Sequence, residues 1–164
     1  MSVAACLKYV IEVDELKDSP VVAGQPSVKH SAKETILLTD GVTAGKFDAV
    51  WSRKEQTIAT ATDIDLYGGL TDAFGASFNA VEIVFFYIKN HSTTATLTLG
   101  GDGTQPADLF VDGQESIGPG GFRMGYYGDS ASGWGPIGAG SGDILQLTPS
   151  ASLEYTLILG LRTS

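Results

Sequence analysis

Apolar and polar residues alternate in short runs along most of the chain, and glycine separates many of the runs. Thr94–Leu99 (TATLTL) alternates cleanly and ends at a Gly-Gly pair, whereas Val81–Asn90 is so apolar that we expect both of its faces to be covered. Alternation with a period of two is typical of a strand with one buried face, and a short continuous apolar run is typical of a strand inside a sandwich. The pattern therefore predicts an all-β protein.

Nine segments carry this kind of pattern and are expected to form strands. They are Leu7–Val13, Thr35–Thr39, Phe47–Ser52, Gln56–Leu66, Val81–Asn90, Thr94–Leu99, Gly121–Tyr127, Asp143–Thr148 and Leu153–Arg162. Short strands at regular spacing favour a β-sandwich or barrel, and eight or nine strands fit a jelly roll. We therefore expect a single-domain antiparallel β-sandwich, jelly-roll-like, with a turn at Pro106–Phe110 as its one candidate helical segment.

The N-terminal residues differ from the rest. Leu7–Val13 (LKYVIEV) alternates as a strand does, and a short helix over Val3–Lys17 is the competing interpretation. Asp18–Ser31 contains two prolines and a glycine, which predicts a long loop that serves as a mobile arm or a partner-binding segment. We expect an N-terminal strand and extended arm over residues 1–34 and the β-sandwich domain over residues 35–164.

The overall charge narrows the range of partners. The 164 residues include 19 acidic and 10 basic ones, which gives a formal net charge of −9. Phosphate backbones and anionic membrane surfaces attract clustered Lys and Arg, and no apolar run approaches the roughly 18 residues of a membrane span. We therefore expect no nucleic-acid partner and no membrane partner.

Cys6 is the single cysteine, which rules out an intramolecular disulfide. Met1–Leu16 carries four charged residues and lacks the long apolar stretch of a signal peptide, so we expect synthesis and retention in a reducing cytoplasm, unless the chain leaves by lysis or within a particle.

Residue types that carry catalysis are scattered. Gly138–Asp143 (GAGSGD) looks like a phosphate loop, but a strand pattern follows it where a nucleotide motif needs a helix, so we expect a glycine turn. Asp63, Asp65 and Asp72 can be grouped as carboxylates for acid–base chemistry, yet Asp63 and Asp65 fit the solvent side of a strand better. The aspartates of Gly100–Asp108 lack the spacing of a calcium loop. We expect no catalytic residues, no metal and no cofactor, and we interpret the chain as not being an enzyme.

The segment Gly118–Gly138 concentrates aromatic, Met and Arg side chains among glycines. These residue types are enriched at protein interfaces. Two alternatives stay open: alternate strand residues fill the core, or the aromatic rings stack on sugars. The candidate partner-interface residues are Phe122, Arg123, Met124, Tyr126, Tyr127 and Trp134.

The stretch from about Asp40 to Leu161 resembles a family of small virion proteins of tailed bacteriophages. The matching pieces are DGVTAGKFDAVWS, TATDIDLYGGLTDAFG, VFFYIKN with the following TLTLGG, a PGG turn, and GAGSGDILQL leading to YTLILG. The DLYGGLTDAFG run and the closing GSGDILQL are the most specific of these pieces. The resemblance covers roughly three-quarters of the chain.

This resemblance implies a capsid decoration (cement) protein. Such a protein binds the major capsid protein on the capsid surface of the virion, typically as a homotrimer, after synthesis in the bacterial host cytoplasm. It stabilises a shell by bridging subunits, which requires contact area rather than catalytic groups, and an N-terminal arm can order on a neighbour. Two other classes remain open: a phage tail or fibre component with a glycan-binding β-sandwich, and an enzyme on a β-sandwich or cupin-like scaffold.

Overall fold

The computed structural model describes residues 4–16, 27–100, 113–127 and 133–163, and no helix occurs among them. The chain divides into two units, one of residues 4–38 and a larger one that contains residues 39–164. All described strand pairs are antiparallel except one short parallel pair. The expectation of an all-β, largely antiparallel protein is therefore confirmed.

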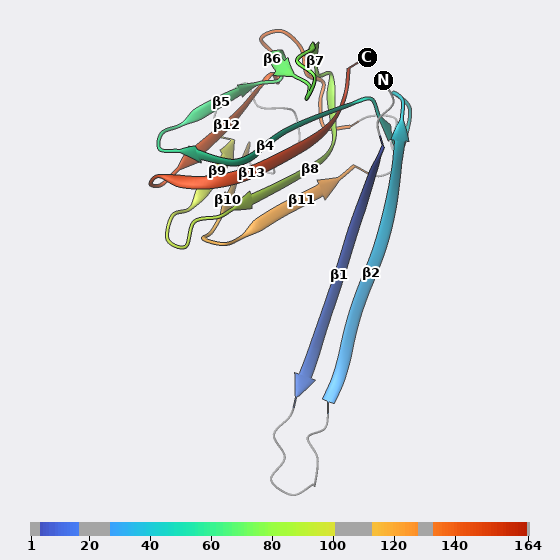
Figure 1. The fold of residues 1–164 in the computed structure, drawn as a ribbon, viewed down its shortest axis with the longest axis vertical. Coiled ribbons are helices and arrows are strands. Elements are labelled where there is room, and N and C mark those ends of the chain that lie inside the picture. The colour runs from blue at the N-terminus through green and yellow to red at the C-terminus, as the bar shows by residue number, and fades with distance from the viewer. Residues whose placement is uncertain (1–3, 17–26, 101–112, 128–132, 164) are drawn as a thin grey trace, which may run out of the picture. The chain divides into compact units, whose positions relative to one another are not determined.

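Two four-stranded sheets form the larger unit (Figure 1). The first, called the β8–β13 sheet, has the spatial order β11 (Phe122–Tyr126), β8 (Glu82–Asn90), β13 (Leu153–Arg162) and β4 (Ala49–Ile58). The second, called the β9–β12 sheet, has the order β10 (Gln114–Ile117), β9 (Leu97–Gly100), β12 (Ile144–Pro149) and β5 (Thr62–Asp65). The last strand, β13, thus lies inside its sheet between two strands from much earlier in the chain.

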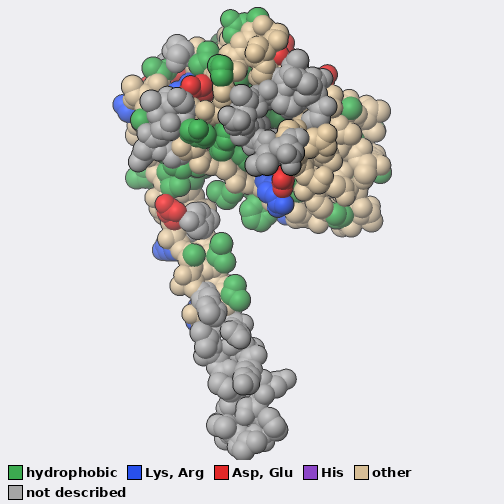
Figure 2. All heavy atoms as spheres, turned by 180° about the vertical axis from the view of Figure 1, so that it is seen from behind, with side chains coloured by type: hydrophobic (Ala, Val, Ile, Leu, Met, Phe, Trp, Pro, Cys, Tyr) green, Lys and Arg blue, Asp and Glu red, His purple; other side chains and the backbone are tan. Residues whose placement is uncertain are grey.

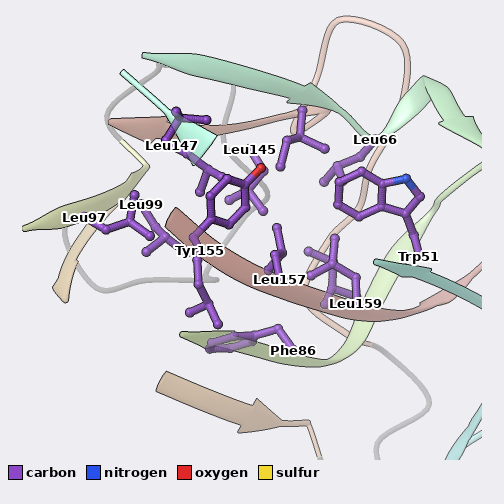
Figure 3. Close-up of a cluster of buried hydrophobic side chains, with 14 of the residues drawn as sticks. Trp51, Leu66, Phe86, Leu97, Leu99, Leu145, Leu147, Tyr155, Leu157 and Leu159 are labelled. Carbon is purple, nitrogen blue, oxygen red and sulfur yellow. The ribbon is translucent and has the colours of Figure 1, made fainter. Parts of the chain in front are cut away.

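The core lies between these sheets, because alternate residues of the strands point inward. In β13 the inward residues are Leu153, Tyr155, Leu157, Leu159 and Leu161, each at most 3% exposed. They meet leucines of β9 and β12, with Trp51 of β4 and Phe86 of β8 in the same cluster (Figure 3). The alternation read from the sequence is therefore the direct cause of the two-layer packing.

A small hairpin follows β5 in the larger unit. It consists of β6 (Tyr67–Thr71) and β7 (Ser77–Asn79). The Asp72 carboxylate accepts hydrogen bonds from the backbone N–H groups of Phe74 and Ala76, both at 2.8 Å, which fixes the turn between the strands. Leu70 is buried, whereas Phe74 at the turn is 79% exposed.

The smaller unit is a long β-hairpin. β1 (Ala5–Leu16) pairs with β2 (Ser27–Asp40) from Ala5 opposite Leu38 to Leu16 opposite Ser27, and the two strands run side by side in Figure 1. The end of β2 pairs in parallel with the two-residue β3 (Lys46–Phe47). The expected N-terminal strand is confirmed, and the competing helix is wrong.

Other expectations need correction. The single strand expected over Gln56–Leu66 is broken into β4 and β5, because the chain bends at residues 59–61 and passes from one sheet to the other. Residues 27–31, expected in a loop, extend β2 because β1 offers them pairing partners. The strands β6, β7 and β10 were not expected. The turn expected at Pro106–Phe110 lies outside the described residues.

Candidate functional site

The solvent side of the β8–β13 sheet carries three of the six side chains predicted to form an interface, namely Phe122, Met124 and Tyr126. Gly125 of β11 faces inward, since a Cβ there would lie 2.5 Å from the Phe86 ring and 2.9 Å from Trp134. Successive residues of a strand point to opposite sides of the sheet, so the side opposite to Gly125 carries Phe122, Met124 and Tyr126. We call this side of the sheet the outer face.

Neighbouring strands extend this apolar surface. Met124 lies opposite Tyr87 of β8, which in turn lies opposite Ile158 of β13. The Tyr87 and Phe122 rings are 6.2 Å apart. Phe122 is 52% exposed and Met124 is 39% exposed, so both reach into solvent. The outer face thus presents one row of apolar side chains across three strands.

A cation borders this row. Lys89 Nζ lies 6.0 Å from the centre of the Phe122 ring and donates a hydrogen bond to the Gly120 carbonyl oxygen at 2.7 Å. An ammonium group at this distance from an aromatic face is attracted by the ring quadrupole. The Phe122 ring is therefore held in place although half of it is exposed.

Phe85 forms the buried base of the outer face. It is 4% exposed and meets Phe47 edge to face, with ring centroids 5.4 Å apart. It lies over Gly160 of β13, where a Cβ would approach the Phe85 ring to 1.9 Å. The absence of a side chain at Gly160 lets the ring lie flat against the sheet.

Arg123 does not belong to the outer face. Its Nε donates a hydrogen bond to Glu115 Oε1 at 2.5 Å, and Glu115 belongs to β10 of the other sheet. The pair therefore links the β11 and β10 edges of the two sheets.

Tyr127 and Trp134 lie together beside the core. Their rings are 5.2 Å apart, and Trp134 also meets Phe86 at 5.4 Å. Backbone hydrogen bonds of 2.9 Å in both directions join Trp134 to Ile83. Of the six predicted interface residues, Phe122, Met124 and Tyr126 share one surface, whereas Trp134 packs against the core as the alternative interpretation held.

Sequence reasoning missed Tyr87 and Ile158. Tyr87 lies in Val81–Asn90, a run whose apolar character indicated burial on both faces, and Ile158 lies in the strand expected over Leu153–Arg162. Each of the two side chains is only partly buried. The exposure of Tyr87 could have been predicted from its position between Phe86 and Ile88, because these two side chains point into the core and the residue between them points the other way.

A cleft runs beside the free edge of β4. Its larger part, of ≈ 510 Å³, lies between Val50–Arg53 on β4 and residues 69–73 of β6 and the following turn. A smaller part of ≈ 270 Å³ continues past Val50 to Phe78 and Thr163. We call the two parts together the edge cleft. Among the described strands, β4 is paired on its β13 side alone, so half of its backbone groups point away from the sheet.

The remaining polar candidates have structural roles. Asp63 and Asp65 lie on the exposed side of β5, as expected, and Asp63 accepts a hydrogen bond from Gln146 at 2.9 Å. Gly140 and Gly142 adopt positive φ angles in a turn that leads directly into β12. The described residues contain no cluster of three or more His, Cys, Asp or Glu side chains suited to a metal ion. They also contain no helix long and apolar enough to cross a membrane.

Comparison with family models, with curated proteins and with solved structures finds no match for this chain.

Proposed function

We propose that the protein is a capsid decoration protein that binds the outside of a phage major capsid shell and stabilises it. The observation that carries the proposal is the outer face, where Phe122 and Met124 are exposed and the half-buried Tyr87 lies opposite Met124 on the neighbouring strand. Exposed apolar and aromatic surface of this kind is characteristic of contact with another protein. The sequence resemblance supplies the identity of the shell.

The order of the strands in the two sheets also supports this proposal. The strands of the two sheets follow the orders β4-β13-β8-β11 and β5-β12-β9-β10. Eight strands that alternate between two sheets in this manner fit a jelly roll, an architecture used by viral capsid proteins. We include the jelly roll, the homotrimeric state and the location on the virion surface in the proposal.

A phage tail or fibre protein that binds glycans is the second candidate. The Phe122 ring, 52% exposed and next to Lys89, favours it, because an exposed aromatic face with a nearby hydrogen-bond donor can stack on a sugar. Trp134, another ring that could stack on a sugar, packs against Phe86 and Tyr127 instead, which counts against this candidate.

Quantitative mass spectrometry of purified virions separates these candidates. Hundreds of copies per particle, in fixed ratio to the major capsid protein, are expected for a decoration protein. A handful of copies would assign the chain to the tail, and absence from the particle would refute both candidates.

We predict that Phe122→Glu weakens binding to shells assembled without this chain by at least about tenfold, because the variant places a charge in an apolar contact. The measurement is co-sedimentation with the shells. Thr60→Glu is the matched control, since it adds the same charge at an exposed bend outside the outer face. Equal binding by both variants would remove the outer face from the interface.

A further inference from the structure

The edge cleft has the form of a site for an additional strand. One wall is the unpaired edge of β4, and the other is formed by β6 and the turn that Asp72 holds. Val50, which is 36% exposed, lines both parts of the cleft. An extended segment placed here would pair with the β4 backbone and continue the β8–β13 sheet, which is how proteins accept strands from partners.

The β1–β2 hairpin carries exposed apolar side chains. By register, Leu7, Ile11 and Val13 share one side of the hairpin with Ile36 and Leu38. Ile11 is 56% exposed and Val13 is 52% exposed, and apolar side chains lie along the hairpin in Figure 2. An isolated two-stranded ribbon is marginally stable in water at best. The hairpin therefore gains stability from any surface that covers this side.

The hairpin also has free strand edges. Among the described strands, β1 pairs with β2 alone, over twelve residues or about 40 Å. Long unpaired edges recruit further strands unless something protects them. The chain thus contains a hairpin strand with an unpaired edge, β1, and a cleft beside a second unpaired edge, that of β4.

Charge favours the hairpin of a second copy as the occupant. Residues 4–38 hold four lysines against five acidic residues, which gives a formal charge of −1, so the rest of the chain carries −8 of the total −9. Two copies of the larger unit repel each other when they approach directly, whereas a nearly neutral hairpin meets little repulsion.

From these observations we propose that the β1–β2 hairpin of one copy docks in the edge cleft of a second copy and extends its β8–β13 sheet. The contact is heterologous, since different surfaces of the two copies meet. Such contacts close into a ring when the rotation between copies allows it and otherwise continue as a filament. The proposal does not depend on binding to a capsid.

A complementation experiment tests this arrangement. Val50→Glu blocks the cleft, and the double change Ile11→Glu with Val13→Glu removes the apolar side of the hairpin. Sedimentation velocity in a reducing buffer gives the state of association. We expect the wild-type protein to associate and each variant alone to be monomeric, because each lacks one half of the contact. An equimolar mixture should form a dimer that grows no further, because it contains one intact cleft and one intact hairpin per pair.

Every other pattern overturns the proposal. A monomeric wild-type protein shows that no second copy is bound. Association that persists in Val50→Glu but not in the hairpin variant indicates contact between two hairpins. Association that persists in both variants places the contact elsewhere. If both variants are monomeric and their equimolar mixture forms no dimer, a head-to-tail contact is excluded. Thr60→Glu serves as the charge control and should associate as the wild type does.

Cross-linking through the single native cysteine gives a second test. Cys6 is exposed on β1, and Ser52 lines the cleft. Wild-type protein mixed with the variant Cys6→Ser, Ser52→Cys should form a mixed dimer with a short flexible bismaleimide. The control variant Cys6→Ser, Phe122→Cys places the thiol on β11 at the opposite end of the same sheet and should react far less. Equal cross-linking of both variants would refute docking at the cleft.

Discussion

Gly160 shows how one residue shapes the outer face. It lies in the middle of a sheet, where glycine is otherwise unfavourable because it adds no packing and costs backbone entropy. Here the Phe85 ring fills the space that a side chain at position 160 would occupy, and the Phe47 ring meets Phe85 edge to face. The residue is therefore required by packing rather than by backbone conformation.

We predict that Gly160→Ala lowers the free energy of unfolding by about 1–3 kcal/mol, the usual cost of overpacking a buried site. The new Cβ would lie 1.9 Å from a ring that is 4% exposed and has little room to move. Urea denaturation measures the change. Gly118→Ala is the control, because a Cβ at Gly118 meets nothing within 4 Å. Equal stability of the two variants would contradict this account of Phe85.

Three elements meet at the buried Arg162. Its Nη1 donates to Glu82 Oε2 at 2.5 Å, and its Nε donates to the Lys46 carbonyl oxygen at 3.0 Å. The same Glu82 oxygen accepts a hydrogen bond from the Gly133 N–H at 3.0 Å. This cluster joins the end of β13 to the start of β8, to β3 and to the segment that leads to Trp134.

We predict that Glu82→Gln destabilises the protein by about 1.5–3 kcal/mol, because the change replaces a charge-assisted hydrogen bond to Arg162, whose side chain is 2% exposed, with a neutral one. Thermal unfolding followed by near-ultraviolet circular dichroism is the appropriate measurement, since Trp134 lies close by. Glu154→Gln is the control on the exposed side of β13. A similar effect of both changes would indicate loss of net charge rather than loss of the buried pair.

The sandwich core is expected to fold without the β1–β2 hairpin. The core cluster draws on residues from Trp51 onward, and among the described side chains of β1 and β2 only Leu38 is buried. A chain that begins at Leu38, a residue that is 1% exposed, should therefore keep its melting temperature within a few degrees of the full-length value. Differential scanning calorimetry measures it. Loss of cooperative unfolding in the shortened chain would show that the sandwich depends on the hairpin.

The sequence was informative about elements where local patterning decides the structure. Alternation in β9, β12 and β13 predicted both the strands and their buried sides. It failed at residues 59–61, because Thr60 and Thr62 suit a strand and nothing local indicates the bend. It also missed β10 (QESI), which is short and polar and becomes a strand because β9 offers it a partner.

The candidate site was partly predictable for the same reason. Phe122, Met124 and Tyr126 share a face because they alternate along one strand. Arg123 and Trp134 could not be assigned, since their roles depend on Glu115 in the other sheet and on Phe86 some fifty residues earlier in the chain. The edge cleft is equally invisible in the sequence, because β4 and β6 form its walls without any local motif.

At the scale of the whole molecule, the order of synthesis matters. β13 supplies five core side chains and pairs with both β4 and β8, yet it is translated after every other strand of the sandwich. Residue 153 follows residue 58 after about 5–20 s at bacterial or eukaryotic elongation rates. Until β13 is made, β4 has no neighbour in its sheet and β8 can pair with β11 alone, so an incomplete chain exposes unpaired strand edges. Chains that stop early cannot complete the sandwich, so the two-sheet core forms only in molecules whose translation reached the last strand.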